Sequence, residues 1–366
     1  MTAATSRPTG EPAGSHAWTL QYLRLRLIAN VLFCLLRPLA LIGYYFRSYN
    51  EHVPSGAVSR RTIYIRAPST RRRLPIIIYT PTGVSKPRGT ILNWHGSGFV
   101  LPNHGLDSLF CSHMAARLEC TVLDVDYVKA PKWPFPWAVR EVSDVLSWFF
   151  ERAKVEQGLD TDYVALSGFS AGGNLSLVGS TLFTKQADAQ EDRIQAIACF
   201  YPVTDFTKPD GSKSAPGGKP PSLLVRLFKF FSQSYIPKGT NVRDPRLSVL
   251  LAPSESFPKR VWIAAGDLDT LYTDGQDLIN KLNKERPSSA QDEQVRATFI
   301  TATQRKHGWD QEPNTKSKKE GAKYYELVVD EIREAWRLKA QGSRSSSDGQ
   351  PVSAANAANA AIKGKL

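Results

Sequence analysis

The feature that most constrains this chain of 366 residues is a serine set between glycines, directly after an apolar run. Residues 163–166 read Y-V-A-L, and residues 168–173 read G-F-S-A-G-G, with Ser170 in the middle. Small residues around the serine allow a strand to turn sharply into a helix, which projects the hydroxyl into a cleft where it can attack a carbonyl. Glycine and serine are common in turns, so the pattern predicts a nucleophile only together with other motifs.

A second small-residue loop, H-G-S-G-F, begins at His95 and follows an earlier apolar strand candidate. Such a loop can offer backbone N–H groups to the oxyanion that forms when a carbonyl is attacked, together with the N–H of the residue after the nucleophile. We expect these donors to be Ser97, Gly98 and Ala171, each contributing roughly 3 kcal/mol to lowering the barrier. His95 and Gly96 are expected to support the loop rather than to transfer protons.

An acidic turn and a histidine complete the set in the second half of the chain. The turn A-A-G-D-L-D-T-L follows an apolar strand candidate and contains Asp267 and Asp269. His307 is followed by G-W and is the only histidine after that turn. A serine hydroxyl is a weak nucleophile at neutral pH and needs a base. The pattern therefore predicts Ser170 as nucleophile, His307 as its base, and one of the two aspartates as the group that orients the histidine.

These motifs, in this order, resemble the hormone-sensitive-lipase-like branch of the α/β-hydrolase superfamily. That branch carries an H-G-G-G loop, a G-x-S-A-G-G elbow, a D-x-L turn and an H-G-F turn, and its triad follows in the order Ser, Asp, His. Three further segments extend the resemblance over roughly residues 60–335: D-Y-V-K-A-P from Asp126, Y-P-V-T-D from Tyr201 and D-P-R-L-S from Asp244. Several ordered matches are far more specific than any single motif.

The resemblance also implies roles for individual residues. The T-L after Asp269 matches the D-x-L turn, which favours Asp269 over Asp267 as the partner of His307 and leaves Asp274 as a helix-start residue. The chain departs from the family pattern at three positions: Ser97 replaces a glycine, Lys132 a glutamate and Thr273 an aspartate. These departures affect the geometry expected for the pocket and leave the reaction class unchanged.

The catalytic region predicted at residues 60–338 alternates strands and helices. The strand candidates are 62–66, 76–80, 90–94, 121–126, 163–166, 196–201, 261–265 and 295–301. Residues 137–154 carry apolar side chains at helical spacing. This alternation predicts the α/β class, with a mostly parallel central sheet and helices on both faces. The resemblance implies the α/β-hydrolase fold with a helical lid.

An insertion at about residues 207–240 interrupts the alternation. Residues 208–221 are rich in Pro, Gly and Lys and predict a flexible loop, and residues 222–231 predict a short apolar helix. The resemblance implies that this insertion forms part of a lid and a wall of the substrate pocket. Asp126 and Tyr127 are expected at the pocket floor. We expect three aromatic residues, Trp133, Phe135 and Trp137, to pack in the core or the lid.

Residues 18–46 are strongly apolar, and residues 27–46 form a window of 20 residues, long enough to cross a bilayer. Arg37 near its middle disfavours crossing, and Pro38 follows it. Two alternatives remain open for the segment 18–48: a membrane anchor or in-plane hairpin kinked at Pro38, or a pair of cap helices over the site. The protein is accordingly expected either on a membrane, such as that of the endoplasmic reticulum, or in the cytoplasm.

Charge and composition exclude several other classes. The net charge is +13, and residues 1–90 contribute +11 of it, from 13 Lys/Arg and two Glu. A basic region beside an apolar one favours an anionic membrane surface, and no nucleic-acid motif accompanies it. No metal-binding spacing occurs, and the four cysteines (Cys34, Cys111, Cys120, Cys199) are expected as buried thiols. Residues 1–17 and 340–366 are predicted to be disordered tails.

The sequence therefore predicts a serine hydrolase that cleaves carboxylic esters without cofactor or metal. An apolar lid predicts a small hydrophobic substrate, such as a short-acyl or acetyl ester of a hydrophobic alcohol; a sterol or a secondary metabolite would fit. Two alternatives use the same fold: an amidase or formamidase with the same triad, and a non-catalytic ligand receptor. The sequence does not indicate an oligomeric state.

Overall fold

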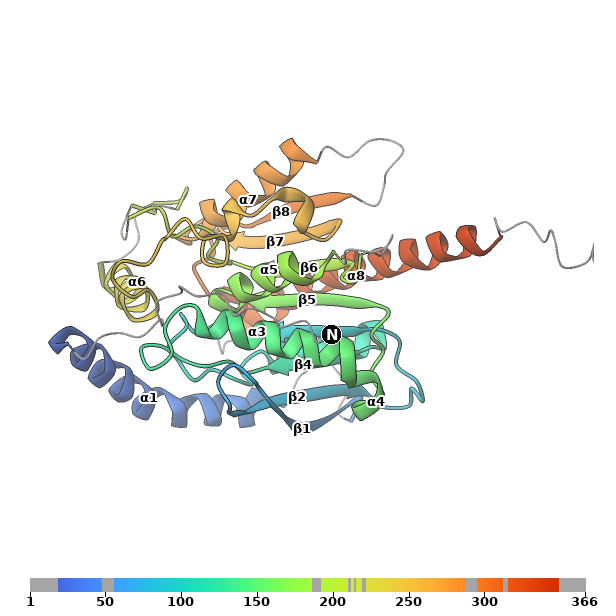
Figure 1. The fold of residues 1–366 in the computed structure, drawn as a ribbon, viewed down its shortest axis with the longest axis horizontal. Coiled ribbons are helices and arrows are strands. Elements are labelled where there is room, and N and C mark those ends of the chain that lie inside the picture. The colour runs from blue at the N-terminus through green and yellow to red at the C-terminus, as the bar shows by residue number, and fades with distance from the viewer. Residues whose placement is uncertain are drawn as a thin grey trace, which may run out of the picture.

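The computed structural model describes residues 19–47, 56–185, 192–209, 212–213, 215–218, 222–286, 295–311 and 315–348. Its centre is an eight-stranded sheet in the order β1-β2-β4-β3-β5-β6-β7-β8 (Figure 1). The strands are β1 (Val58–Arg66), β2 (Arg73–Pro81), β3 (Thr90–Trp94), β4 (Thr121–Val125), β5 (Val164–Phe169), β6 (Ala196–Phe200), β7 (Arg260–Gly266) and β8 (Arg296–Ala302). All eight strands predicted from the sequence are present, with ends that shift by a few residues.

The sheet is parallel from β4 to β8, and only β1 and β2 pair antiparallel with their neighbours. The nucleophile candidate follows β5, which lies between β3 and β6 near the middle of the sheet. Because parallel strands end at the same edge, the segments after β3, β5, β7 and β8 converge there. The predicted α/β class and mostly parallel sheet are confirmed.

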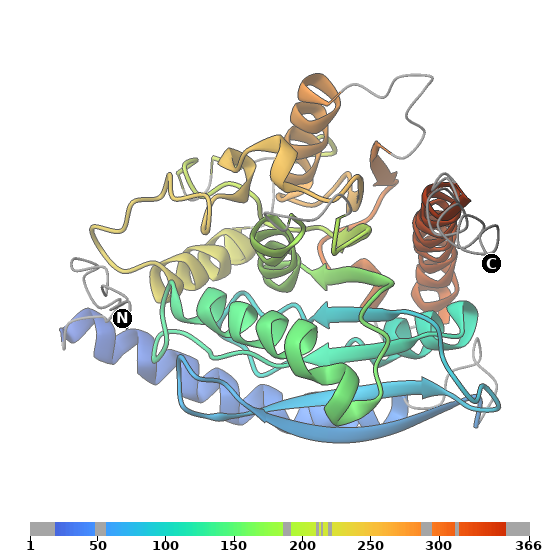
Figure 2. The same ribbon diagram turned by 45° about the vertical axis from the view of Figure 1, so that its right-hand side comes forward.

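Helices cover both faces of the sheet (Figures 1 and 2). They are α2 (Ser108–Leu118), α3 (Trp137–Trp148), α4 (Lys154–Gln157), α5 (Ala171–Phe183), α7 (Tyr272–Glu285) and α8 (Thr315–Asp348). Apolar residues of α3, α5 and α7 share one core cluster, and those of α2 and α8 share the other. Alternate residues of β5 divide between the clusters, as a strand buried on both faces requires: Val164 and Leu166 join one and Ala165 the other.

Two helices differ from their predicted bounds. The helix expected at 137–154 consists of α3, one π-helical turn (Phe149–Ala153) and α4, which follow without a break. The C-terminal helix α8 continues to Asp348, past the point where a disordered tail was predicted to begin at residue 340. Residues 349–366, and the N-terminal tail up to residue 18, lie outside the described residues.

The apolar N-terminal segment forms one helix, α1 (Leu20–Arg47), with Pro38 inside it. Neither the hairpin nor the pair of cap helices expected from the sequence is present. The helix contacts α2 and α6 (Ser222–Tyr235), the helix of the predicted lid insertion. Among the residues that the structure describes, no helix is long and apolar enough to cross a membrane.

Candidate active site

Ser170 occupies a strained turn between β5 and α5. Its φ of +52° is unusual for a residue other than glycine, and its N–H is held by the carbonyl of Phe200 at 2.9 Å. Gly172 allows the helix to begin this close to the sheet, because a Cβ there would lie 2.0 Å from the carbonyl oxygen of Trp94. The local sequence thus forces the serine side chain out at the carboxyl edge of the sheet.

Three side chains that are distant in the sequence meet at that edge. The Nε2 atom of His307 lies 3.0 Å from the Oγ atom of Ser170, and its Nδ1 atom lies 2.8 Å from Oδ2 of Asp269. Asp269 is fully buried, and its Oδ1 atom accepts the N–H of Leu271 at 2.9 Å. The imidazole is therefore held between a fixed carboxylate and the hydroxyl, which is the geometry that proton transfer from the serine requires.

Two other aspartates near this turn, Asp267 and Asp274, are engaged elsewhere. Asp267 binds through its backbone: its N–H donates to Ala302 and its carbonyl accepts from Gly217. Asp274 lies in the first turn of α7, but Leu271 holds the N-cap position. The Asp274 carboxylate instead accepts the N–H groups of Thr204 and Asp205, and so ties the segment after β6 to α7. Asp274 therefore stands at the start of α7, as expected, but it does not cap the helix.

The loop after β3 lies beside Ser170. Gly98 has a φ of +57°, and a Cβ there would lie 2.4 Å from the ring of Phe231, so glycine is required at this point. Among the described residues, none accepts a hydrogen bond from the backbone N–H of Ser97, Gly98 or Ala171. Gly98 and Ala171 line the cavity beside Ser170, whereas Ser97 is buried behind it.

Tyr127 and Asp126 lie behind this loop and do not line the cavity beside Ser170, so the expectation that they form the pocket floor was wrong. The Tyr127 hydroxyl donates to the carbonyl of His95 at 2.9 Å and lies 2.5 Å from the Oγ atom of Ser97, while its ring stacks on His95. The Nε2 atom of His95 lies 3.3 Å from Asp126. Position 97, where the family pattern has glycine, thus carries a side chain that fastens the loop to the end of β4.

An ion network surrounds the buried His95. Arg72 and Lys129 both contact the Asp126 carboxylate, at 3.2 and 2.8 Å. Burial alone would raise the pKa of Asp126, but Lys129 and the hydrogen bond with His95 lower it well below its ordinary value. Burial, and then the Lys129 ammonium, lower the pKa of His95 to about 4 against the attraction of Asp126. His95 is therefore neutral at physiological pH.

The depressed pKa of His95 predicts an acid-sensitive fold. His95 binds its proton near pH 6.5 in the unfolded protein and near pH 4 in the folded protein. The contribution of His95 to the free energy of unfolding is therefore fully present above pH 6.5 and is lost as the pH falls from 6.5 towards 4. Between pH 6.5 and pH 5 this group should remove about 1.5 kcal/mol from the free energy of unfolding. Urea unfolding across this range should show a shallower decline in His95→Asn than in the unchanged protein. Equal declines would contradict the assignment, because both proteins share every other titrating group.

Comparison with known proteins bears on this arrangement. A family model described as "alpha/beta hydrolase fold" matches residues 91–311, which is more than half of the chain and includes all the motifs above. The chain belongs to the hormone-sensitive-lipase-like α/β-hydrolase family. The resemblance inferred from the motifs is thus confirmed.

Curated relatives of this α/β-hydrolase include the carboxylic ester hydrolase LipN of Mycobacterium tuberculosis, which is 29% identical over 240 residues, covering 65% of this chain and 63% of the relative. Ethyl acetate hydrolase of Pseudomonas putida is 29% identical over 208 residues, covering 55% of this chain and 63% of the relative. Rabbit (Oryctolagus cuniculus) arylacetamide deacetylase is 30% identical over 174 residues, covering 45% of this chain and 44% of the relative. The matches thus span less than two thirds of the length of these relatives.

Solved structures share the fold. An esterase of Pyrobaculum calidifontis superposes with a TM-score of 0.69 at 21% identity, covering 84% of this chain and 92% of the esterase. The carboxylesterase EstE1, cloned from a metagenomic library, gives a TM-score of 0.69 at 22% identity, covering 84% of this chain and 97% of the other. At these identities the similarity establishes the α/β-hydrolase fold of the chain and nothing finer.

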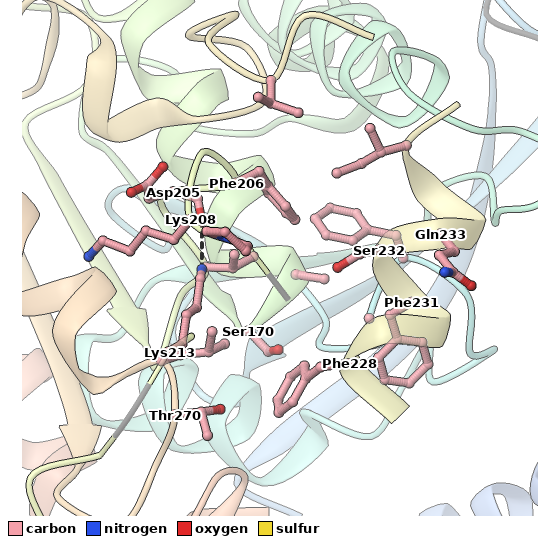
Figure 3. Close-up of a pocket in the computed structure, with 18 of the residues that line it drawn as sticks. Ser170, Asp205, Phe206, Lys208, Lys213, Phe228, Phe231, Ser232, Gln233 and Thr270 are labelled. Carbon is pink, nitrogen blue, oxygen red and sulfur yellow. Dashed lines mark hydrogen bonds between the residues drawn. The ribbon is translucent and has the colours of Figure 1, made fainter. Parts of the chain in front are cut away.

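A cavity of about 340 Å³ opens beside Ser170 (Figure 3). Phenylalanines form much of its wall: Phe99, Phe206, Phe228 and Phe231. The last two lie on α6, so the predicted insertion does wall the cavity. Phe228 also packs edge-on against the imidazole of His307, with ring centroids 5.6 Å apart. Trp133, Phe135 and Trp137, which were expected to pack, are buried or partly buried in the core.

Two lysines that the motif search did not single out lie on the side of the cavity away from α6 (Figure 3). Lys213 binds the carboxylate of the buried Asp274 and the carbonyl of Asp205, both at 2.5 Å. Lys208 pairs with Asp277 of α7 at 2.8 Å. The Pro, Gly and Lys content of residues 208–221 indicated a loop. It did not indicate that the two lysines would pair with aspartates distant in the sequence. Both charges are neutralised, so the cavity stays mainly apolar.

The thiols have no place in this site. Cys111, Cys120 and Cys199 are buried and unbonded to one another, as expected. Cys34, in contrast, is exposed on α1, because this part of the helix lies away from the core. No group of three His, Cys, Asp or Glu side chains in the described part of the chain is arranged to hold a metal ion.

Proposed function

We propose that this protein is a serine hydrolase that cleaves carboxylic esters. The observation that carries the proposal is the chain of contacts from Asp269 through His307 to Ser170, with both hydrogen bonds at or below 3.0 Å and the hydroxyl at the cavity. The same three residues match the motifs of the family to which the chain belongs. Relatives whose names describe ester cleavage, including an arylesterase of Saccharolobus solfataricus, support the same reaction class.

The proposed reaction has two steps, acylation of Ser170 and hydrolysis of the acyl-enzyme, and His307 transfers the protons in both. His307 Nε2 takes the proton of the Ser170 hydroxyl while Oγ attacks the ester carbonyl, and Asp269 stabilises the imidazolium. The N–H groups of Ser97, Gly98 and Ala171 hold the oxyanion, and His307 gives its proton to the leaving alcohol. His307 then removes a proton from water as the water attacks the acyl-enzyme. The bond between the acyl group and Oγ breaks, His307 returns the proton to Ser170, and the carboxylic acid leaves. His95 and Gly96 support the loop that carries the donors.

The shape of the cavity supports a small, hydrophobic ester as substrate. Its volume of about 340 Å³ and its phenylalanine walls suit a short acyl chain or an apolar alcohol. The lysines on its other side are already paired with Asp274 and Asp277, so they give no reason to expect an anionic substrate. An acetyl or other short-acyl ester of a hydrophobic alcohol, such as a sterol or a secondary metabolite, remains our proposal for the substrate class.

Phe231 is predicted to limit the length of the substrate. Its ring lies over Gly98 and lines the cavity, so Phe231→Ala should open space beside the oxyanion donors. We expect the ratio of kcat/KM for p-nitrophenyl hexanoate to that for the acetate to rise by about tenfold. Phe230→Ala is the matched control, because the neighbouring ring does not line the cavity. An unchanged ratio in Phe231→Ala, or an equal rise in the control, would argue against this role.

Two other functions are compatible with the fold. The arylacetamide deacetylase among the relatives favours amide cleavage as an alternative reaction, so an ester and the corresponding anilide should be compared directly. A ligand receptor would need no reactive serine. A fluorophosphonate probe applied to the folded protein should label Ser170, and peptide mapping should locate the label. Absence of label and of ester turnover in folded protein would refute the hydrolase proposal and favour the receptor.

A further inference from the structure

A row of large apolar side chains lies exposed along one face of α1. We call the set Leu20, Leu23, Leu27, Val31 and Leu35 the outer row; their exposed fractions run from 48% to 86%. The spacing of three and four residues places them on one side of the helix. Scattered apolar residues are common on protein surfaces, but a continuous row of this kind marks a surface that another body covers.

The opposite side of α1 packs against the rest of the protein. Tyr22, Leu25 and Ala29 are buried, and Ala29 belongs to the core cluster that contains α3 and α5. The helix therefore lies along the protein surface by its inner face, beside α6, as both ribbon views show (Figures 1 and 2). A helix held by its inner face leaves the outer row exposed to the surroundings, where a partner can contact the helix along its length.

The charge of the two neighbouring helices identifies the kind of partner. Together, α1 and α6 contain six Lys/Arg residues and no Asp or Glu. On α6, the exposed Arg226 and Lys229 flank Leu227, which is itself 36% exposed. Apolar side chains beside unbalanced positive charge match the anionic surface of a membrane. The same positive charge on a second copy of this chain would repel, which makes self-association through this face the weaker match.

We propose that α1 and α6 form a docking surface for anionic membranes, with α1 lying in the plane of the lipid surface. The outer row would enter the acyl boundary while Arg226 and Lys229 contact the headgroups. Because α6 also carries Phe228 and Phe231, docking would bring the cavity next to the lipid. Docking would then deliver a hydrophobic ester to Ser170 directly from the membrane, and this consequence rests on the proposed function. The docking itself does not depend on the proposed function.

The test is co-sedimentation of the full chain with vesicles, which requires no turnover. The protein should sediment with vesicles of 70% phosphatidylcholine and 30% phosphatidylserine at 50 mM salt. Binding should weaken clearly at 500 mM salt and with pure phosphatidylcholine, because the attraction to the headgroups is screened or removed. Absence of sedimentation with the mixed vesicles would overturn the proposal.

Two sets of variants assign the binding to the surface. The triple variant Leu23→Gln, Leu27→Gln, Leu35→Gln keeps good helix formers and should lower vesicle affinity by about tenfold or more. Its matched control replaces three exposed apolar residues elsewhere: Val155→Gln, Leu182→Gln, Leu327→Gln. Arg226→Gln with Lys229→Gln should lower affinity for the mixed vesicles by about fivefold per charge. The paired control is Arg333→Gln with Arg337→Gln on α8.

Solution size and basal activity separate the remaining outcomes. One contrary outcome is that the wild-type protein is a dimer that does not bind vesicles, and that the triple variant is a monomer. This result would assign the outer row to contact with a second copy of the chain and would overturn the proposal. If the control variants lost as much vesicle affinity as the variants of α1 and α6, the proposal would also be overturned. Hydrolysis of soluble p-nitrophenyl acetate should be unchanged in the triple variant. If neither protein hydrolyses this ester but docking persists, the proposed function fails and the docking surface stands.

Discussion

Replacing Ser170 by alanine is expected to lower kcat for a short ester by about 10⁴-fold or more, with a much smaller change in KM. The reason is geometric: in the part of the chain that the structure describes, only this hydroxyl lies at the cavity within 3.0 Å of the His307 imidazole. Without it no acyl-enzyme forms, and the remaining N–H donors can only assist direct attack by water. The measurement is steady-state hydrolysis of p-nitrophenyl acetate, with thermal unfolding to verify that the variant folds.

Ser232 provides the control for this prediction. It lines the same cavity from α6 but makes no hydrogen bond to His307, so Ser232→Ala should retain activity within a few-fold. The two variants remove the same atoms from the same cavity. Comparable activity in the two, at equal stability, would mean that the reaction does not pass through Ser170.

Asp269→Asn is expected to lower kcat by about 10⁴-fold near neutral pH. The carboxylate now accepts a hydrogen bond from Nδ1 of His307 at 2.8 Å, which leaves Nε2 free to accept the serine proton. An asparagine can present an N–H group to Nδ1, which would place the ring proton on Nε2, where it blocks this transfer. The pH dependence of kcat/KM should show the loss throughout the neutral range.

Asp267→Asn is the matched comparison, because Asp267 lies two residues earlier on the same turn and contacts its neighbours through its backbone. It should retain most of the activity. A larger loss in Asp267→Asn than in Asp269→Asn would show that the acidic member of the triad had been misassigned.

Much of the fold and the candidate site was predictable from the sequence because the relevant signals are local. Each buried strand is a short apolar run, and each predicted strand is present within a few residues. The small residues around Ser170 are required at the turn itself, where Gly172 touches the end of β3. The order of the motifs along the chain then identified the family, which the family model confirms.

Other features depend on contacts between distant segments. Asp126 and Tyr127 sit at the end of β4, where the pattern predicted a pocket floor, yet Lys129, Arg72 and His95 hold them behind the loop. The apolar residues of α1 fall on more than one side of the helix, so their spacing could not show which side packs inward. Its burial reveals an inner face at Tyr22, Leu25 and Ala29 and an outer row that faces away from the protein.

The sequence by itself determined the class of fold, the family and the identity of the candidate nucleophile, base and acid, because these follow from short patterns and their order. Only the tertiary structure decided which phenylalanines wall the cavity, which carboxylates neutralise Lys208 and Lys213, and which face of α1 stays exposed. The physical reason is that a side chain's surroundings are set by whatever packs against it. Those neighbours come from segments more than a hundred residues away as readily as from the next turn.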